Sequence, residues 1–499
     1  MAGSAAAPYI DRLAGPMRRL TLLFAVLVAV ALAVVMGLGL ERLADFAWQR
    51  LALLVTLEVA LLAATVIFRP EKRLPILCDP AVLFVGFESQ FFVVGPLALP
   101  YTTFNVESPV PPNMVVMTVL AFIGLLTMYL IGLHIPLGPA IADHLTDFRG
   151  AHRHAPGRWM ERFLIAVGIA GCAGYAISQG GVSSMLNVGY GVAEGGAYYS
   201  AAFLLLVLGT FLMVWRIVNS ERWTWMQLSP LAALLAFEVA YWGILMGVRK
   251  WLFHLFFGIA AIFLLRRGTR AVPRFLFPTV MIALAVYMSV WGNLRGRSVN
   301  SFFQEHADPL QAKVETSIAQ GYIEAVAGPF GAACLTLQVF PEIEPFRYGK
   351  TLLVALLSPI PRAVWPDKPI GLGKELVWYL GPYYSMTYDP ARGLSITPTI
   401  VGDFYANLGV FGILLGGLIL GVVSRVIARY AVKNMQDGVQ MEAARVLVPA
   451  VFLAGLVELR ADSMMLTLFY MYTMIPLLFL LTVFTFDTTR GNAAEPVDG

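Results

Sequence analysis

The chain consists mainly of apolar runs that are each about as long as a lipid bilayer is thick. A transmembrane helix needs about 20 mostly apolar residues, and the sequence contains about twelve such runs. Helices are the expected spanning element because the runs are too long and too evenly apolar for barrel strands. The predicted spans lie near residues 20–40, 50–68, 79–99, 112–133, 160–178, 199–218, 228–247, 251–267, 272–292, 402–424, 443–458 and 463–486.

Composition points to the same class of protein. Of the 499 residues, 58% are hydrophobic and 13% are charged, against about 25% charged residues in soluble domains. We therefore predict an all-α, polytopic integral membrane protein that forms one membrane domain in three parts. Residues 1–292 supply the first nine helices, residues 293–398 form a large outward loop with short or re-entrant helices, and residues 399–499 supply the last three helices and a tail.

Lysine and arginine predict the orientation in the membrane, because cytoplasmic loops carry an excess of both. The short loops 100–111 and 179–198 contain neither residue. We therefore expect both termini in the cytoplasm and the loop 293–398 on the outer side. The net charge of +4 follows from this bias and gives no reason to expect nucleic-acid binding. The groups predicted to face the cytoplasm are Arg12, Arg18 and Arg19; Arg69, Lys72 and Arg73; Arg149, Arg153 and Arg158; Arg266, Arg267 and Arg270; and Arg425, Arg429 and Lys433.

Cysteine and histidine give little sign of metal chemistry. Cys78, Cys172 and Cys334 have spacings that fit no metal motif, and only Cys334 lies on the predicted oxidising side, so no intrachain disulfide is expected. His144, His152 and His154 cluster in one predicted cytoplasmic loop. A metal site is conceivable there, but a solvated surface loop is the ordinary interpretation. No metal or other cofactor is expected.

The predicted outward loop contains several kinds of segment. Residues 311–340 are rich in alanine, glutamine and leucine and predict one or two short helices. Residues 351–360 are apolar but too short to span, which favours a re-entrant or interfacial segment. Four prolines in residues 359–369 exclude a helix and stiffen the backbone. That stiff frame holds Arg362, Trp365, Asp367 and Lys368.

Cations gather near the predicted outer ends of the helices, against the bias that favours the cytoplasm. Guanidinium groups match phosphate oxygens two at a time, so several of them at one membrane face suggest a lipid diphosphate as ligand. Alternatively they reach toward lipid head groups or pair with Glu458, Asp462 and Asp308. The candidate cations are Arg249, Lys250, Arg295, Arg297, Arg362, Lys368 and Arg460.

The segment Gly402–Gly412 opens the tenth predicted helix and carries a candidate general base. Asp403 lies at the predicted outer start of the helix, and Asn407 follows one turn later on the same face. A carboxylate there would accept a proton from a sugar hydroxyl. The alternative is helix capping, since the helix dipole and free backbone amides favour a carboxylate in the first turn. Gly412-xxx-Gly416 and Gly417-xxx-Gly421 predict close-packing faces for neighbouring helices.

Two further groups of residues have both a functional and a structural interpretation. Trp365, Trp378 and Tyr405 belong to a set of aromatic residues that either stack on sugar rings or anchor the protein at the membrane interface. Glu58, Glu88 and Glu238 lie within apolar helices, where a charge is costly. These acids are either proton-relay groups of a transporter or members of hydrogen-bonded clusters.

In several of these segments the chain resembles the Wzy-type polymerases of O-antigen and exopolysaccharide repeat units. The proline-rich and Gly-Asp-Phe-Tyr segments are the more specific ones, and the family often has glutamate where this chain has Asp403. The resemblance extends from the third predicted helix to the last turn, with only hydropathy in common between the segments. The segments that carry the resemblance are Asp79-Pro80, Gly247-Val248-Arg249, Pro361–Pro369, Gly402–Gly409 and Leu459-Arg460.

The resemblance implies a GT-C-like glycosyltransferase of the bacterial inner membrane with its active site on the periplasmic face. Such an enzyme moves a growing glycan from undecaprenyl diphosphate to a new lipid-linked unit, without nucleotide sugar or metal. It implies Asp403 as the group that activates the acceptor, with Asp367 as the competing base. Tyr405 and Asn407 would line the site, Trp365 and Trp378 would contact sugars, and Arg249, Arg295, Arg297, Arg362 and Arg460 would hold the diphosphate. The implied partners are a chain-length regulator and a flippase.

Two other functions remain open at this point. A ligase that moves finished glycan onto a lipid acceptor uses the same donor and the same chemistry. A flippase or secondary transporter would place its polar groups at the bilayer midplane on broken helices. The polar residues of this sequence gather at one predicted face, which favours an enzyme.

Overall fold

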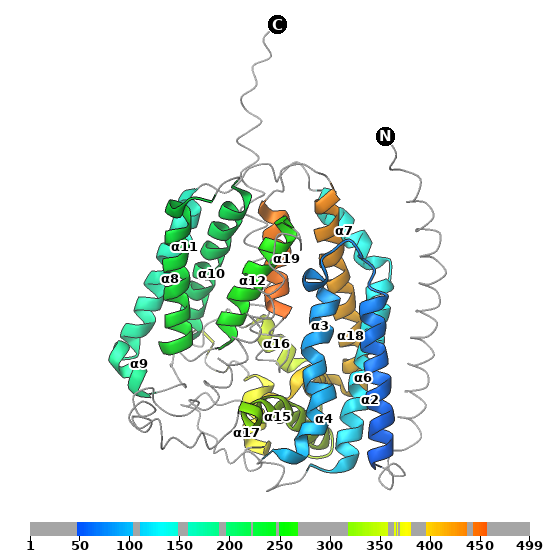
Figure 1. Cartoon of the computed structure of the whole chain (residues 1–499). Helices are drawn as coiled ribbons and strands as arrows, with labels where there is room; N and C mark the ends of the chain where they lie inside the picture. The colour runs from blue at the N-terminus through cyan, green and yellow to red at the C-terminus, as the bar shows by residue number, and fades with distance from the viewer. Residues whose placement is uncertain are drawn as a thin grey trace, which may run out of the picture.

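The protein is helical throughout the part that the computed structural model describes (Figure 1). No strand occurs in these residues, which confirms the predicted all-α class. The described residues are 47–102, 110–147, 158–188, 196–220, 223–245, 249–267, 318–357, 364–365, 367, 370–380, 396–436 and 443–456.

Five of the described helices are long and apolar enough to cross a membrane, which supports a membrane-embedded protein. They span Pro80–Tyr101, Pro112–His134, Arg158–Ser178, Ala202–Asn219 and Thr399–Val432. The total of about twelve spans stays a prediction, because the segments 20–40, 272–292 and 463–486 lie outside the described residues.

The first group of helices follows the sequence prediction closely. It contains α2 (Ala47–Ile67), a short turn η2 (Ile76–Cys78), α6 (Pro112–His134) and the amphipathic α7 (Leu137–Asp147). Between η2 and α6 lies one continuous helical path, made of α3 (Pro80–Ser89), the π-helical η3 (Gln90–Val94), α4 (Gly95–Ala98) and η4 (Leu99–Tyr101). Asp79 caps α3 by accepting a hydrogen bond from the amide of Ala81, 3.0 Å away, so a structural role accounts for the Asp79-Pro80 pair.

The second group also matches predicted segments. Its members are α8 (Arg158–Ser178), the short α9 (Val182–Val188), α10 (Gly196–Asn219), α11 (Trp225–Glu238) with the π-helical η6 (Val239–Leu245), and α12 (Arg249–Arg267). Figure 1 shows α8, α10 and α11 on one side and α2, α3, α6 and α18 on the other. Between them lies α19 (Ala443–Leu456), which contacts α12, α10, α18 and α3.

The predicted outward loop differs from expectation in one respect. Instead of one or two short helices in residues 311–340, the structure has a single 22-residue helix, α15 (Ile318–Val339). It packs against α4, α6 and α18 inside the bundle. The reason is its uncharged, largely small-residue stretch from Val326 to Val339, which lies almost wholly buried. At Gly95, for example, an added Cβ would lie only 2.8 Å from Phe330.

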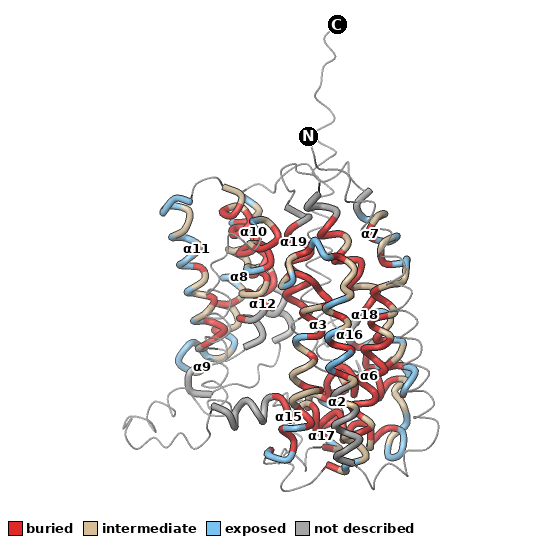
Figure 2. The backbone as a smooth tube through the Cα atoms, turned by 45° about the vertical axis from the view of Figure 1, so that its right-hand side comes forward, coloured by how far each residue is buried: buried red, intermediate tan, exposed pale blue. Residues whose placement is uncertain are grey.

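The rest of the loop supplies two short helices. α16 (Lys350–Leu356) falls on the apolar segment that was too short to span, and α17 (Leu372–Leu380) follows the proline-rich segment. The last long helix, α18 (Thr399–Gln436), is 38 residues long and extends well beyond the predicted span 402–424. Figure 2 shows that buried residues predominate in α6 and α18, whereas α11 carries exposed ones. Trp225 and Met226 of α11 are 81% and 87% exposed, as expected for the outer face of a membrane protein.

Glycines hold α18 and α6 in backbone contact. A Cβ added to Gly417 would lie 2.4 Å from the carbonyl oxygen of Leu125, and one added to Gly421 would lie 2.1 Å from that of Tyr129. This confirms Gly417-xxx-Gly421 as a packing face for a neighbouring helix. Gly412 and Gly416 differ from the prediction, because they receive Phe404 of α18 itself. A break in the helix, described below, makes that contact within one helix possible.

Ion pairs tie together one end of the bundle. Arg425 of α18 pairs with Glu71 at 2.8 Å, and Arg429 lies 3.6 Å from Asp143 of α7. In the second group, Arg216 of α10 makes two hydrogen bonds, of 2.8 and 2.9 Å, to Glu161 of α8. Residues predicted to share a membrane face thus meet at the same end of the first group. Which face this end occupies stays a prediction.

The glycine contacts predict a sharp difference between two identical substitutions. Gly421→Ala places a methyl group against the α6 backbone, so it should lower the free energy of unfolding by about 1–3 kcal/mol. Gly86→Ala in α3 meets nothing within 4 Å and should be neutral or stabilising by up to about 1 kcal/mol. Thermal unfolding of the detergent-solubilised variants measures both. Equal melting temperatures would contradict the packing role of Gly421.

Candidate functional site

A break in α18 shapes the candidate site. Leu408 (φ −139°, ψ 17°) and Gly409 (φ 61°, ψ −145°) depart from helical geometry. The Gly409 conformation is one that glycine adopts readily and other residues avoid. The break separates a short first half, Thr399–Asn407, from the long second half that packs on α6. It also leaves the last carbonyl groups of the first half without their usual partners inside the helix.

Backbone amides from another part of the chain satisfy two of these carbonyl groups. The amide of Arg347 donates to the carbonyl of Ala406, and the amide of Tyr348 donates to that of Asn407, each at 2.8 Å. We call residues 345–349 the capping segment. Its Phe346 ring lies against both sides of the break. A Cβ added to Gly409 would be 3.0 Å from Phe346, and the Phe346 and Tyr405 ring centroids are 5.8 Å apart.

The first half of α18 buries a polar face next to the break. Thr399, Asp403 and Asn407 recur every four residues and so share one face of the helix. They are 0%, 0% and 1% exposed. The side-chain amide nitrogen of Asn407 donates to the Asp403 backbone carbonyl at 2.8 Å and to the Asp403 carboxylate Oδ1 at 3.3 Å. The predicted pairing of Asp403 with Asn407 is therefore present.

A third member of this polar cluster comes from α16. The hydroxyl of Thr351 donates to Asp403 Oδ1 at 3.2 Å and accepts a hydrogen bond from the Asn407 side-chain amide. Thr351 is 2% exposed. We call Thr351, Asp403 and Asn407 the buried polar cluster. Part of the region 293–398 thus packs against Asp403.

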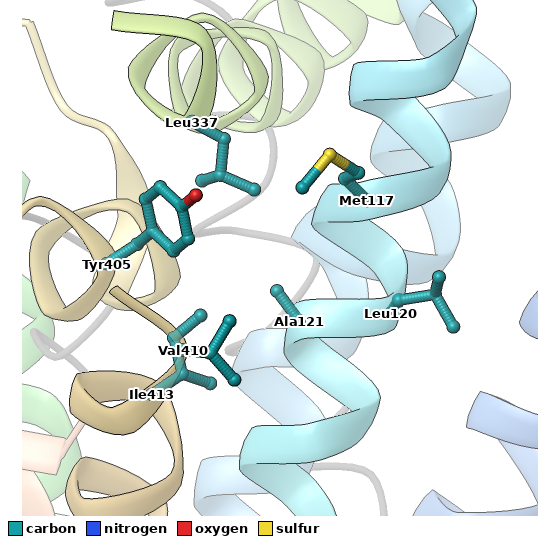
Figure 3. A pocket seen from close by; sticks show the side chains of 7 residues that line it. All are labelled: Met117, Leu120, Ala121, Leu337, Tyr405, Val410 and Ile413. Atoms are coloured by element: carbon teal, nitrogen blue, oxygen red, sulfur yellow. The ribbon is translucent and has the colours of Figure 1, made fainter. Parts of the chain in front are cut away.

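Tyr405 lies elsewhere. It is two positions from both Asp403 and Asn407, which places it on the opposite side of the helix. There it lines an apolar cavity of about 80 Å³ between α6, α15 and α18. Figure 3 shows its hydroxyl near Leu337 in a cavity lined otherwise by aliphatic side chains and Met117. Such a lining suits a hydrocarbon chain better than a sugar. Tyr405 and Asn407 therefore do not line one site together.

The remaining predicted site residues either have no described contact with the buried polar cluster or lie outside the described residues. Asp367 is exposed in a turn, Trp365 is half-buried, and Trp378 of α17 is 49% exposed. Arg249 and Lys250 belong to the first turn of α12, and nothing is described of their side chains. The other predicted cations, Arg295, Arg297, Arg362, Lys368 and Arg460, lie outside the described residues. Of the predicted set, the structure thus brings together Asp403 and Asn407.

Sequence reasoning missed Arg347, which joins the capping segment to α17. Arg347 Nε donates a hydrogen bond to Glu375 Oε2 at 3.2 Å, and Nη2 donates one to Glu375 Oε1. Nη2 also donates to Glu344 Oε2 at 3.1 Å. It also lies 5.2 Å from the centre of the Phe340 ring. Hydrogen bonds from the Tyr379 hydroxyl and from Arg347 lower the pKa of Glu344. The only signal in the sequence was a lone arginine among the acids of residues 342–347.

The acids predicted within apolar helices are all buried. Glu58, Glu88 and Glu238 are at most 1% exposed. Glu238 accepts a hydrogen bond from Thr210 at 2.9 Å. Cys78, Cys172 and Cys334 are buried and not in disulfides. No group of three metal-ligating side chains occurs within the described ranges, and His152 and His154 lie outside them.

The buried polar cluster predicts that two buried threonines respond differently to loss of the hydroxyl. Thr351→Val removes the hydroxyl that hydrogen-bonds to Asp403 and Asn407 and leaves those buried polar atoms without it. The substitution should lower the free energy of unfolding by about 1–3 kcal/mol. Thr127 is equally buried but donates only to a carbonyl of its own helix, at 2.8 Å, so Thr127→Val should change stability by well under 1 kcal/mol. Thermal unfolding in detergent compares the two. Equal losses would contradict the cluster.

No protein-family model, no curated protein and no solved structure matches this chain.

Proposed function

We propose that this protein is a glycosyltransferase that polymerises undecaprenyl-diphosphate-linked repeat units at the periplasmic face of a bacterial inner membrane. The observation that carries the proposal is the buried polar cluster. In it, an acid near the start of a long membrane helix is held by Asn407 of the same helix and by Thr351 of α16, 52 positions earlier in the chain. The helical, apolar fold supports a lipid-linked substrate, and the resemblance of the sequence segments supports the reaction class.

In the proposed reaction, the acceptor sugar hydroxyl attacks the anomeric carbon of the donor glycan. The new glycosidic bond forms as the bond to the diphosphate oxygen breaks, and undecaprenyl diphosphate leaves with the electron pair. Asp403 takes the hydroxyl proton, while Thr351 and Asn407 orient its carboxylate. Arg362 and the other predicted cations stabilise the leaving diphosphate. Because Asp403 is fully buried, the proposal requires α16 to yield as the acceptor enters beside Thr351.

A second candidate, transport of a lipid-linked glycan, is favoured by one observation. Transporters use discontinuous helices with buried polar groups at the break, and α18 has such a break beside Asp403 and Asn407. Against it stands the gathering of the predicted cations at one membrane face, since transport sites lie near the midplane. A ligase shares the donor and chemistry of the polymerase and differs only in its acceptor.

A reconstitution and a gene deletion together distinguish the three functions. Purified protein in liposomes receives undecaprenyl-diphosphate-linked repeat units alone, and the products are separated by size. A ladder of lengthened glycans supports polymerisation. Movement of unchanged units across the bilayer supports transport. In cells without the gene, single units on the surface with no ladder support a polymerase, whereas accumulated long chains on the carrier support a ligase.

The two candidate bases give a direct test of the site. Asp403→Asn should slow chain extension by about 100-fold or more, the usual contribution of a general base. Asp367→Asn should have little effect, because Asp367 is exposed in a turn, whereas Asp403 is buried and hydrogen-bonded to Thr351 and Asn407. Asp143→Asn is the control for removing a carboxylate elsewhere in the protein, because Asp143 pairs with Arg429 at the other end of α18. This variant should keep normal chain extension. The reverse order for Asp403 and Asp367 would make Asp367 the base.

The cations give a separate test of diphosphate binding. Arg362→Ala and Arg249→Ala should each reduce chain extension strongly while the folded protein is recovered in normal yield. The reason is that a phosphate-binding guanidinium contributes to the transition state rather than to packing. Size-exclusion profiles check folding and the glycan ladder checks activity. Full chain extension by both variants would refute the diphosphate assignment.

A further inference from the structure

The capping segment is tied to two different parts of the candidate site. On one side, its amides at residues 347 and 348 cap the first half of α18, 2.8 Å from the carbonyl groups of Ala406 and Asn407. On the other side, the Arg347 guanidinium binds Glu375 of α17. α17 also carries Trp378, a predicted sugar contact. One residue thus contacts α18 through its backbone and α17 through its side chain.

The same segment also sets the position of Thr351. Tyr348 (φ 49°) and Gly349 (φ 81°) both have positive φ, and they turn the chain from the capping segment directly into α16. Thr351 is the second residue of α16 and reaches Asp403 Oδ1 at 3.2 Å. Only three positions separate the cap at Tyr348 from this contact. A shift of the capping segment therefore shifts Thr351 against Asp403.

The Arg347 side chain ties this segment to α17. It is 15% exposed, and its partners Glu375 and Glu344 are 16% and 29% exposed. An arginine fork held by two carboxylates and an aromatic ring has little freedom to rotate. A lysine would keep the charge but lose the two-point contact with Glu375.

We infer that Arg347 is a positioning residue for the proposed transfer: its ion pair with Glu375 holds the capping segment so that Thr351 orients Asp403. The inference rests on the proposed function and names a residue that acts through others. Arg347 does not touch the reacting atoms. Its loss acts by misplacing Thr351 and the end of the first half of α18.

The first arm of the test measures geometry without activity. Full-length protein carrying Thr351→Cys together with Asn407→Cys is oxidised with copper phenanthroline, and the disulfide between the introduced thiols is quantified by mass spectrometry. Adding Arg347→Ala should remove most of this cross-link. Arg216→Ala is the matched control, because Arg216 makes a similar two-point pair with Glu161 far from α18, and it should leave the cross-link unchanged. An unchanged cross-link with Arg347→Ala overturns the inference.

The second arm measures turnover of lipid-linked repeat units by protein without the introduced cysteines. Arg347→Ala should lower kcat by about 100-fold, as a misplaced catalytic group does, with a smaller change in KM. Arg347→Lys and Glu375→Gln, which disturb packing less, should fall between Arg347→Ala and wild type. Arg216→Ala should keep wild-type kcat. A lost cross-link with unchanged kcat also overturns the inference.

The two arms separate this inference from the proposed function. A wild-type protein that never lengthens lipid-linked glycans refutes the proposed function, and the cross-linking arm still decides whether Arg347 holds α16 against α18. A wild-type protein that lengthens glycans, with Arg347→Ala equal to Arg216→Ala in both arms, refutes the inference alone.

Discussion

The arrangement of the candidate site depends on how the broken end of a helix is satisfied within a membrane protein. In the bilayer core no water replaces a lost backbone hydrogen bond, so irregular backbone is tolerated only where protein groups pair with it. The amides of Arg347 and Tyr348 supply that pairing for Ala406 and Asn407. Without them, the break at Leu408 and Gly409 would leave carbonyl groups exposed to an apolar surrounding. The capping segment is therefore what allows Asp403 to sit on a separate short helix.

The two halves of α18 differ in what they contact. The second half lies on α6 through Gly417 and Gly421 and carries Arg425, which pairs with Glu71. The first half has a polar face toward α16 and, through Tyr405, an apolar face toward the cavity beside α6 and α15. A rigid support thus carries a short element with one polar and one apolar side. This is the division expected where a lipid-linked polar molecule is handled.

Hydropathy was sufficient to predict the five described helices that are long and apolar enough to cross a membrane, because each contains an apolar run as long as a span. Spacing was sufficient to predict that Asp403 and Asn407 share a face. The break at Gly409 could not be predicted, since Leu408-Gly409 lies inside an apolar run without proline. Tyr405 was grouped with Asp403 by nearness in sequence, although two residues along a helix turn a side chain to the other side. Residues 311–340 predict one or two short helices, whereas the structure has the single helix α15, which continues through Gly328 and Pro329. The contact of Arg347 with Glu375 joins residues 28 positions apart, and the lone arginine among the acids of residues 342–347 does not identify its partner.

The ring of Phe404 acts as a wedge in the bend of α18. A Cβ added to Gly416 would lie 2.1 Å from this ring, and one added to Gly412 would lie 2.2 Å from the Phe404 backbone carbonyl oxygen. Straightening the helix would withdraw the ring from Gly416 and leave a void, so this packing favours the bent form of α18. The helix α16, whose Thr351 meets Asp403, begins directly after the positive-φ residues Tyr348 and Gly349, so this turn fixes the direction in which α16 approaches the bend.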